Sequence, residues 1–152
     1  PVPLDPERMQ AAADLLIGEH DFAAFTTHLS KFPEDQSTRR TLYSIAVRRT
    51  EARGGWPGIP ASAARHAPAE FAVDVTGDAF LYNMVRVIAG ALIEVGRGKQ
   101  PPEWVVECRE AGRRALRMPT APAKGLCLRW VHYREHPHAA FRPGDVPEIP
   151  AS

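Results

Sequence analysis

The sequence contains only two cysteines, Cys108 and Cys127, and neither belongs to a C-x-x-C pair. A disulfide framework needs several paired cysteines, and a structural zinc site that uses cysteines places them at short spacing. The sequence therefore excludes both kinds of stapled domain and indicates a reducing compartment. We expect both thiols to be small core residues.

A long hydrophobic run is also missing. The longest candidate, 80–95, is interrupted by Asn83, Arg86 and Glu94, whereas a helix that spans a bilayer needs about 20 apolar residues. We therefore expect a soluble protein with no membrane partner. The chain does not open with a basic, apolar and small-residue leader, and a first residue of Pro1 indicates a processed chain or a piece of a longer one.

An excess of charge of one sign is absent as well, because 19 Lys and Arg balance 18 Asp and Glu. With a hydrophobic share of 44% over 152 residues, the composition is typical of one globular domain and excludes a disordered tail or a coiled coil. The arginines nevertheless crowd two segments, 39–53 and 97–117. Local basic patches of this kind make RNA a candidate partner.

Caps and hydrophobic periodicity predict a short series of elements. Asp5 and Pro6 are typical of a helix start, and Asp21 can cap a further short turn. The full series is a helix at 6–17, strands at 38–49 and 70–76, helices at 79–95 and 103–111, and a strand at 126–133. This order predicts an α+β fold, in which helices pack on one face of an antiparallel sheet. Three strands are few for such a sheet, so a partner half or a homodimer is indicated.

Both central strands follow a period of two, which predicts the side chains that face inward. These are Thr41, Tyr43, Ile45 and Val47 on the first strand and Phe71, Val73 and Val75 on the second. The connection 50–69 is rich in glycine and proline, and its length indicates a functional loop or an insertion. The end of the chain is polar and interrupted by prolines, so we assign 1–133 to the domain and 134–152 to a tail.

Arg86 is the only charged side chain between residues 79 and 93, in a helix that is apolar on all sides. Such a helix is typically buried, and an unpaired buried charge costs about 3 to 5 kcal/mol. Arg86 therefore needs an anion, either a carboxylate or a phosphate. Two alternatives are open: a structural partner in this chain, namely Asp74, Asp78 or a set of carbonyls, or a catalytic carboxylate supplied from elsewhere.

The histidines do not predict a metal site. Asp21 is expected to cap a turn, with His20 packed beside it and not acting as a catalytic base. His132, His136 and His138 lie where the last predicted strand runs into the proline-rich end, and they lack a fourth ligand. We predict no metal.

Three ordered segments carry the most specific signal, namely LIGEHDF at 16–22, GDAFLYNMVR at 77–86 and TAPAKGL at 120–126. Together they resemble the C-terminal half of the tRNA pseudouridine synthase A (TruA) family, over roughly residues 4–133. The resemblance implies half of a pseudouridine synthase fold.

The resemblance also implies an activity. Members of the family isomerise uridine to pseudouridine in the anticodon stem-loop of tRNA, without a cofactor. Their catalytic aspartate, in an R-T-D type motif, and their active-site tyrosine lie in the N-terminal half, and neither motif occurs in this sequence. The chain alone should therefore be inactive, with an N-terminal catalytic half as its partner.

By the same resemblance, Arg86 is the ion-pair partner of that aspartate. Phe80 and Leu81 would shape the uracil pocket, and Gly125 with Leu126 would form the wall beside the flipped base. An apolar wall and a close approach of the backbone suit a base that has left its stack.

Arginines near both ends of the predicted domain are expected to contact RNA. Arg39 and Arg40 begin the first long strand, while Arg109, Arg113 and Arg117 recur every four residues and would share one side of a continued helix. A solvated basic face is the alternative, with equal weight.

The leading hypothesis is therefore the C-terminal part of a TruA-like enzyme that acts on tRNA in the cytoplasm. The alternative is a catalytically inactive relative, which serves as a structural RNA-binding subunit of a large ribonucleoprotein such as an organellar ribosome. That alternative predicts rRNA as the partner and a mitochondrial or plastid location. A homodimer or a larger assembly is open under both hypotheses.

Overall fold

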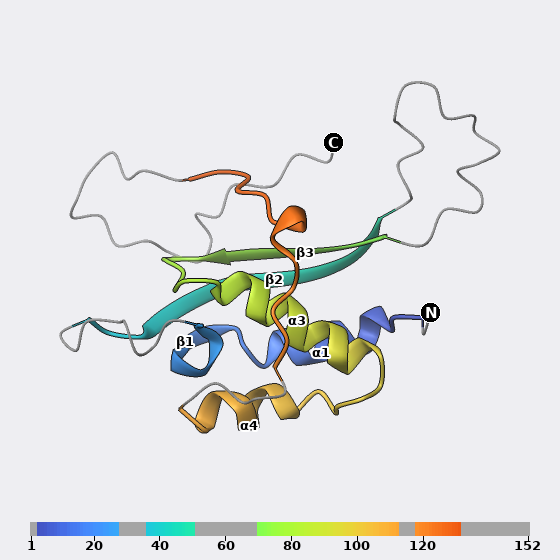
Figure 1. Cartoon of the computed structure of the whole chain (residues 1–152), viewed down its shortest axis with the longest axis horizontal. Coiled ribbons are helices and arrows are strands. Elements are labelled where there is room, and N and C mark those ends of the chain that lie inside the picture. The colour runs from blue at the N-terminus through green and yellow to red at the C-terminus, as the bar shows by residue number, and fades with distance from the viewer. Residues whose placement is uncertain (1–2, 28–35, 51–69, 113–117, 132–152) are drawn as a thin grey trace.

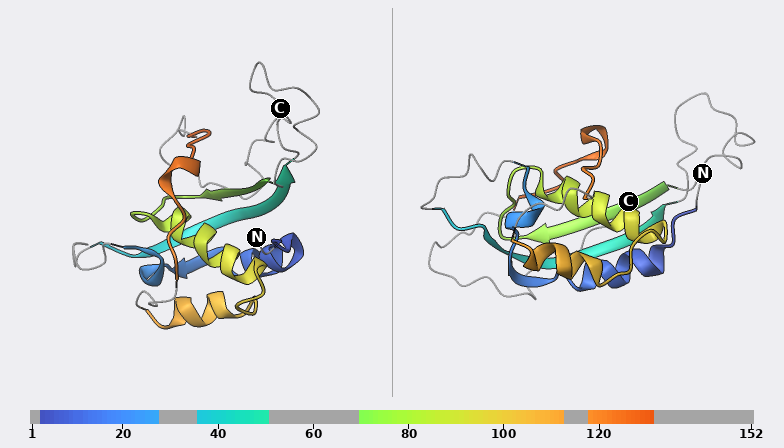
Figure 2. Two further views of the ribbon diagram at one scale, coloured as in Figure 1. Left: turned by 45° about the vertical axis from the view of Figure 1, so that its right-hand side comes forward. Right: turned by 60° about the horizontal axis from the view of Figure 1, so that its bottom comes forward.

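The computed structural model describes residues 3–27, 36–50, 70–112 and 118–131. In these residues a three-stranded antiparallel sheet carries three helices on one face, so the predicted α+β class is confirmed (Figures 1 and 2). The elements in chain order are α1 (Pro6–Asp14), β1 (Gly18–Asp21), the 3-10 turn η1 (Ala23–Phe25), β2 (Arg39–Thr50), β3 (Glu70–Gly77), α3 (Met84–Gly96), α4 (Trp104–Glu110) and the 3-10 turn η3 (Ala123–Gly125). Most of the 50–69 connection and the 134–152 tail lie outside the described residues.

The start of α1 follows the sequence signal. The Asp5 carboxylate accepts hydrogen bonds from the backbone N–H groups of Glu7 and Arg8 at 3.0 and 3.2 Å, and Pro6 occupies the first helical position. These contacts satisfy donors that have no partner within the helix. The helix ends at Asp14 and not at residue 17 as predicted, because β1 begins only four residues further on, at Gly18.

The sequence pattern does not predict β1. Its residues are polar and have no apolar alternation, and only pairing defines the strand: Gly18 lies opposite Leu42 and Asp21 opposite Arg39. The Asp21 carboxylate accepts a hydrogen bond from the Ala23 N–H at 2.9 Å, at the start of η1, so Asp21 does bond to the turn, although Phe22 and not Asp21 occupies the N-cap position.

A β-bulge changes which side chains of β2 face the core. The register against β3 shifts between Leu42 and Ser44, and the extra residue moves the alternation by one position. Leu42 and Ile45 are therefore both buried. The predicted inward face is correct after the bulge, where Val47 packs on the core, and wrong before it at Thr41 and Tyr43.

On β3, the predicted inward residues Val73 and Val75 do pack against the core cluster. Phe71, which is only partly buried, does not belong to that cluster.

A side chain covers part of one edge of β2. β1 pairs only with residues 39–42, and beyond them Gln10 of α1 lies beside the strand. Its Oε1 accepts from the Val47 N–H at 2.8 Å, and its Nε2 donates to the Ile45 carbonyl at 2.9 Å. The amide thus satisfies one donor and one acceptor of the strand, as a neighbouring strand would.

α3 begins at Met84 and not at residue 79 as predicted. The reason is local: Asn83 has φ 61° and ψ 4°, in the left-handed region, which a continuous right-handed helix does not contain. Asp78, expected to cap this helix, instead accepts from the N–H groups of Thr41 and Ala79 at 3.0 and 2.6 Å.

The C-terminal end of α3 packs closely on α1. A Cβ on Gly96 would lie 2.6 Å from Cγ and 2.7 Å from Sδ of Met9, so a glycine is needed for the contact. The Gly96 carbonyl accepts from the Asp5 N–H at 2.9 Å. The core cluster, which includes Met9 of α1, Ile88 of α3 and Val105 of α4, joins all three helices.

The predicted strand at 126–133 is not formed in its described part, which ends at residue 131. A strand requires a hydrogen-bonded neighbour, and this segment has none among the described residues. Leu126 and Leu128 are exposed, and so is Cys127, so the expectation that both thiols lie in the core is correct for Cys108 and wrong for Cys127. An ion pair of 3.6 Å between Arg129 Nη1 and Asp74 Oδ1 joins the segment to β3.

Within the described residues, no helix combines the length and the apolar character that a bilayer crossing requires.

Candidate functional site

Arg86 lies in the first turn of α3 and is partly buried. Its Nε donates to the Ala121 carbonyl at 2.8 Å, and its own carbonyl accepts from the Ala121 N–H at 2.9 Å. Its Nη1 donates to Oδ1 of Asn83 at 2.9 Å. Side chain and backbone of one residue therefore hold Ala121, and we call this arrangement the Arg86 clasp.

No carboxylate contacts Arg86 among the described residues. Asp74 pairs with Arg48 and with Arg129, and Asp78 accepts from two backbone N–H groups. The alternative in which Arg86 pairs with Asp74 or Asp78 is therefore wrong, whereas the carbonyl alternative is met in part, by the oxygen atoms of Ala121 and Asn83. Neutral oxygens accept hydrogen bonds but do not cancel the charge, and Nη2 has no hydrogen-bond partner in the described chain.

A glycine makes the clasp possible. The segment after α4 crosses α3 at Gly90, where an added Cβ would collide with the Pro119 carbonyl oxygen and lie 2.8 Å from the carbonyl carbon (Figure 1). Backbone atoms cannot move aside as a flexible side chain can. The absence of a side chain at Gly90 therefore brings Ala121 within reach of Arg86.

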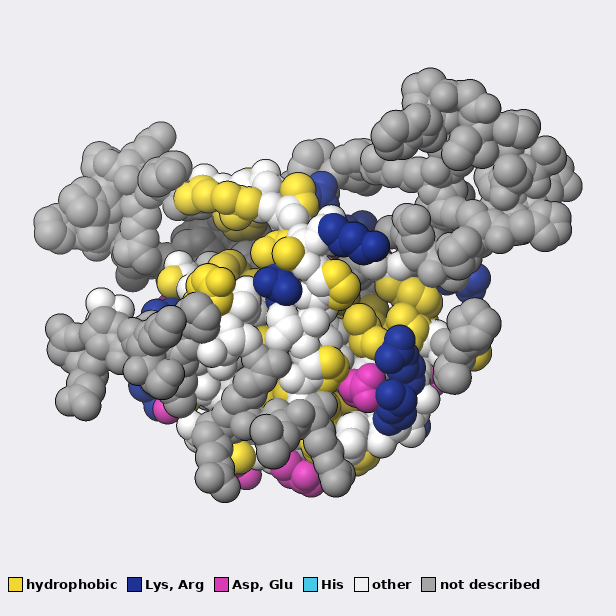
Figure 3. Space-filling view, viewed as in Figure 1, with side chains coloured by type: hydrophobic (Ala, Val, Ile, Leu, Met, Phe, Trp, Pro, Cys, Tyr) yellow, Lys and Arg dark blue, Asp and Glu magenta, His cyan; other side chains and the backbone are white. Residues whose placement is uncertain are grey.

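The four expected pocket residues differ in exposure. Phe80 and Leu126 are 41% and 55% exposed, and Gly125 ends the exposed turn η3, whereas Leu81 is 4% exposed and belongs to the core cluster. Figure 3 shows hydrophobic side chains at the surface on the side where η3 and the segment after it lie. Three of the four thus reach solvent, and Leu81 supports the turn from within.

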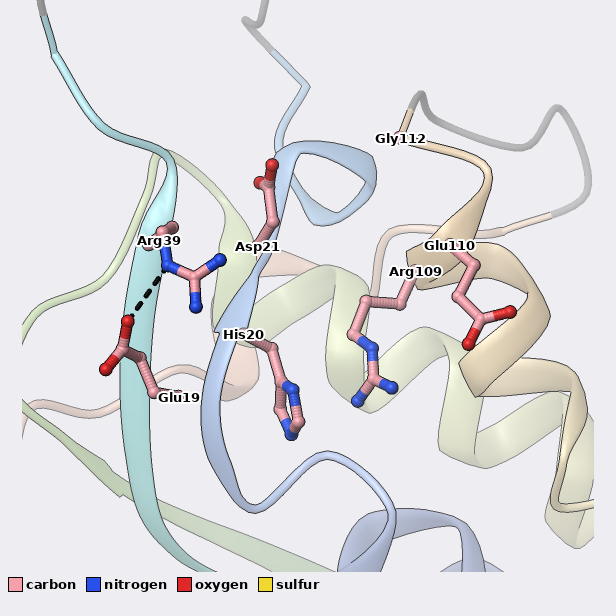
Figure 4. A pocket seen from close by; sticks show the side chains of 7 residues that line it. All are labelled: Glu19, His20, Asp21, Arg39, Arg109, Glu110 and Gly112. Carbon is pink, nitrogen blue, oxygen red and sulfur yellow. Dashed lines mark hydrogen bonds and ion pairs between the residues drawn. The ribbon is translucent and has the colours of Figure 1, made fainter.

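Two of the expected RNA-binding arginines line one hollow of about 280 Å³ (Figure 4). Arg39 comes from β2 and Arg109 from α4, and His20 lies between their elements. Three carboxylates share the lining, those of Glu19, Asp21 and Glu110. Positive charge therefore does not dominate this hollow.

The basic side chains here have partners within the chain. Arg39 Nε forms an ion pair of 2.9 Å with Glu19, and Arg109 Nη1 donates to the Leu15 carbonyl at 3.0 Å. Arg40 donates to the carbonyls of Ser37 and Arg39, while its Nε is buried without a partner among the described residues. Arg113 and Arg117 lie outside the described residues.

His20 has a packing role, as expected. One of its ring nitrogens, Nε2, lies 2.9 Å from the Ile17 carbonyl, and its ring meets the Phe22 ring edge-on at 6.1 Å between centroids. No group of three metal-ligating side chains occurs in the described part of the chain. His132, His136 and His138 lie outside it, so their assignment stays a prediction.

Sequence reasoning missed the residues around Arg86. Asn83 and Ala121 bond to its side chain and Thr27 bonds to Asn83, yet these three residues come from segments that are far apart in the chain. The one available signal was an asparagine directly before a predicted helix turn, since asparagine is the residue besides glycine that most readily adopts a positive φ.

Comparisons with known proteins place this fold in the pseudouridine synthase class, because residues 12–134 match the family described as tRNA pseudouridine synthase. The chain is 44% identical over 130 residues to tRNA pseudouridine synthase A of Geotalea uraniireducens (strain Rf4) and 41% identical over 132 residues to that of Staphylococcus saprophyticus. It is 40% identical over 143 residues to the protein of the same name from Frankia casuarinae. The chain belongs to the tRNA pseudouridine synthase family, and the resemblance to TruA is confirmed.

The matches cover most of this chain but less than half of each relative. The three alignments cover 86%, 87% and 93% of this chain, and 45%, 42% and 44% of the Geotalea, Staphylococcus and Frankia proteins respectively. The chain therefore spans about 45% of the length of the curated relatives it matches.

Proposed function

We propose that this chain is the C-terminal part of an enzyme that isomerises uridine to pseudouridine in the anticodon stem-loop of tRNA. An N-terminal half supplies the catalytic aspartate, and Arg86 is the ion-pair partner of that aspartate. The family membership supports the reaction, and the Arg86 clasp supports the role of the arginine.

One observation carries the proposal. The Arg86 guanidinium is held at Nε and Nη1 by oxygen atoms that bear no charge, while no carboxylate of the described chain neutralises it. Two hydrogen bonds fix its orientation, and within the described residues no acid cancels its charge and no acceptor occupies Nη2. Such a group suits a planar, two-pronged interaction with a carboxylate.

The ion pair would prepare the aspartate for reaction. A guanidinium beside a carboxyl favours the charged form and lowers the pKa of that carboxyl. The aspartate is then ionised at neutral pH, which a nucleophile requires. The two prongs of Arg86 also fix its direction, so the carboxylate meets the base in one orientation.

The remaining expected site residues take up the uridine in this proposal. Phe80 and Leu126 offer apolar surface beside the clasp, Gly125 lets the backbone approach the base, and Leu81 supports the turn that carries Phe80. A base must leave its stack before it can react, and apolar surface compensates for the lost stacking.

The test compares Arg86→Lys and Arg86→Met in the complete enzyme that carries this chain. Lysine keeps the charge but lacks the planar fork, and methionine removes the charge. We expect both variants to lose pseudouridine formation by roughly a hundredfold or more, since breaking a buried pair costs several kcal/mol. The melting temperature should fall only modestly, because the hydrogen bond from the Ala121 N–H to the Arg86 carbonyl does not involve the side chain.

Arg8 provides the matched control. Its Nε and Nη2 also donate to backbone carbonyls, those of Val95 and Gln100, at the other end of α3. Arg8→Met should keep turnover while costing a similar amount of stability. Near-normal turnover in both Arg86 variants would show that this arginine is only structural, and the proposed role would be lost.

A second test uses the chain alone. Without an R-T-D type motif, the purified chain should convert no uridine in tRNA, whereas the complete enzyme should convert it. Pseudouridine formed by the chain alone would contradict the proposal that the N-terminal half supplies the catalytic aspartate.

A further inference from the structure

Asn83 stands at the N-cap position of α3 but does not cap the helix. Its side chain makes no hydrogen bond to the first backbone N–H groups of α3, although asparagine is among the preferred capping residues. Its backbone has φ 61°, and it is the non-glycine residue with a positive φ in the described chain. A capping residue normally has an extended backbone instead, so this residue is placed for another purpose.

Both ends of the Asn83 amide are used elsewhere. Oδ1 accepts from Arg86 Nη1 at 2.9 Å, and Nδ2 donates to Thr27 Oγ1 at 2.8 Å. The direction of the amide is determined by chemistry, because a guanidinium has only donors and therefore requires the oxygen. The neighbouring Thr26 hydroxyl donates to the Tyr82 carbonyl at 3.0 Å. Two successive threonines thus hold the turn from which Asn83 reaches Arg86.

The left-handed backbone of Asn83 occurs together with these contacts. Asn83 stands directly before the helix, three residues from Arg86, and its amide bonds to Arg86 and Thr27 instead of to the first backbone N–H groups of α3. A left-handed backbone in a residue other than glycine costs free energy and persists where surrounding contacts impose it. Here those contacts are the bonds to Thr27 and Arg86.

We propose that Asn83 is a positioning residue, which fixes the Arg86 guanidinium so that its remaining N–H groups face the partner carboxylate. The inference rests on the proposed function of Arg86. Ala121 holds Nε and Asn83 holds Nη1, so two neutral acceptors define the plane of the fork. A neutral amide is suited to this task because it orients the guanidinium without competing for its charge.

Two substitutions in the complete enzyme separate this role from a merely structural one. Asn83→Gly keeps the positive φ without strain and removes the acceptor. Asn83→Asp keeps the shape of the side chain but places a carboxylate on Arg86 within the chain. We expect each variant to lower turnover by about tenfold or more, because a hydrogen bond to a charged group contributes roughly such a factor. The KM for tRNA should stay within about twofold, since Asn83 is not proposed to touch RNA.

Asn83→Asp is the decisive variant. If the residue served only to start the helix, an aspartate of the same shape would preserve turnover and stability. In the positioning role, the new ion pair preserves the melting temperature or raises it while turnover falls, because the partner aspartate no longer meets an uncompensated guanidinium.

A double-mutant cycle tests whether Asn83 acts through Arg86. In an Arg86→Lys background, Asn83→Gly should change the residual turnover by less than about twofold, since the group it orients is already gone. Equal loss in both backgrounds would overturn the inference.

Two threonines offer a matched pair of controls. Thr27→Val removes the partner of the Asn83 Nδ2 and should lower turnover by about twofold to fivefold, less than Asn83→Gly, because the bond to Arg86 remains. Thr38→Val removes a comparable bond, from its hydroxyl to Asp21 at 2.6 Å, and should leave turnover unchanged.

The outcomes distinguish the two proposals. Inactive Arg86 variants with near-normal Asn83→Gly and Asn83→Asp turnover would reject the positioning role alone. Active Arg86 variants would reject the function proposed for Arg86, and the positioning role with it. If Asn83→Gly fails to fold, Asn83→Asp decides: reduced turnover at a normal melting temperature supports the inference, and normal turnover overturns it.

Discussion

The two ends of α3 are held by different kinds of contact. At the C-terminal end, Gly96 packs on Met9 of α1, and the neighbouring Val95 is fully buried. At the N-terminal end, Arg86 and Asn83 use their polar atoms to hold a loop residue and a threonine. One end therefore anchors the helix in the core, and the other presents a charged group at a defined angle.

Both arrangements depend on a glycine, Gly96 at the end of α3 and Gly90 in its middle, but the two glycines differ in what they face. A Cβ on Gly96 would meet the flexible end of the Met9 side chain, whereas a Cβ on Gly90 would meet the backbone of Pro119. A side chain can change its rotamer, and a backbone segment must move as a whole. The close contact of Gly96 with Met9 therefore serves packing of the core, whereas the close contact of Gly90 with Pro119 serves the positioning of Ala121 beside Arg86.

The largest effect should come from Gly90→Ala in the complete enzyme. The added methyl group pushes Pro119 away, and Ala121 follows it, so the Arg86 clasp opens. We expect turnover to fall by about a hundredfold, with a loss of stability of roughly 1 to 3 kcal/mol from overpacking. Single-turnover assays and thermal melts measure the two quantities.

Wild-type turnover in Gly90→Ala would contradict the positioning role of the contact between Gly90 and Pro119. It would mean that the segment can shift without disturbing Arg86.

Gly96→Ala should have the second largest effect, and it should act on stability alone. Met9 must adopt another rotamer within a packed core, which costs roughly 1 to 3 kcal/mol. Below the melting temperature the variant should turn over as the wild type does, because the clasp lies at the other end of α3. A loss of activity equal to that of Gly90→Ala would show that the ends are not independent.

Asp74→Asn should have a smaller effect. It weakens the ion pairs that join β3 to Arg48 and Arg129, whose side chains are 54% and 42% exposed, while that of Asp74 is 17% exposed. Because solvent reaches both arginines, each pair contributes roughly 0.2 to 1 kcal/mol, so stability should change little and turnover should remain. A large loss of activity would instead show that the ion pair of Arg129 with Asp74, and not the Arg86 clasp, holds the 126–131 segment in its active position.

The smallest effect is a difference in reactivity between the two thiols, and it tests how tightly the core around Cys108 is packed. Burial raises the pKa of Cys108 from 9.0 to about 11, and the charge of Glu107 adds to this. Iodoacetamide at pH 8 should therefore modify the exposed Cys127 and spare Cys108. Equal labelling of both would show that the core opens readily.

The raised pKa of Cys108 also determines in which direction the free energy of unfolding changes with pH. The unfolded chain loses the Cys108 proton near pH 9, while the folded chain keeps it to about pH 11. The unfolded state then binds fewer protons, so the free energy of unfolding should fall as the pH rises through this window. In Cys108→Ser, denaturant melts between about pH 9 and pH 11 should no longer show the fall in the free energy of unfolding that the thiol causes.

The sequence predicted the elements that local signals define. Asp5 and Pro6 began α1 as expected, and the period of two found β2 and β3. β1 escaped prediction because its residues are polar and only pairing with β2 makes them a strand. The bulge at Tyr43 also arises from pairing, so alternation alone assigned Thr41 and Tyr43 to the wrong face.

The candidate site shows the same division. The family motif and the isolated charge singled out Arg86, but they left Asp74 and Asp78 open as its partners, and only the structure shows that these acids contact other groups. The contacts to Ala121 and Thr27 link residues 35 and 56 positions apart, and no periodic pattern connects such distant positions. The left-handed backbone of Asn83 likewise follows from its surroundings.

The Arg86 clasp also closes a long loop of the chain. The bond from Arg86 to Ala121 spans 35 residues, and the enclosed chain includes most of α3 and the whole of α4. Closing a loop of this length costs chain entropy, and the contacts inside it must form to repay that cost. The guanidinium is therefore held in its direction only while the segment after α4 lies across α3 at Gly90. A chain in which this segment has left Gly90 carries the same arginine without the acceptor for its Nε.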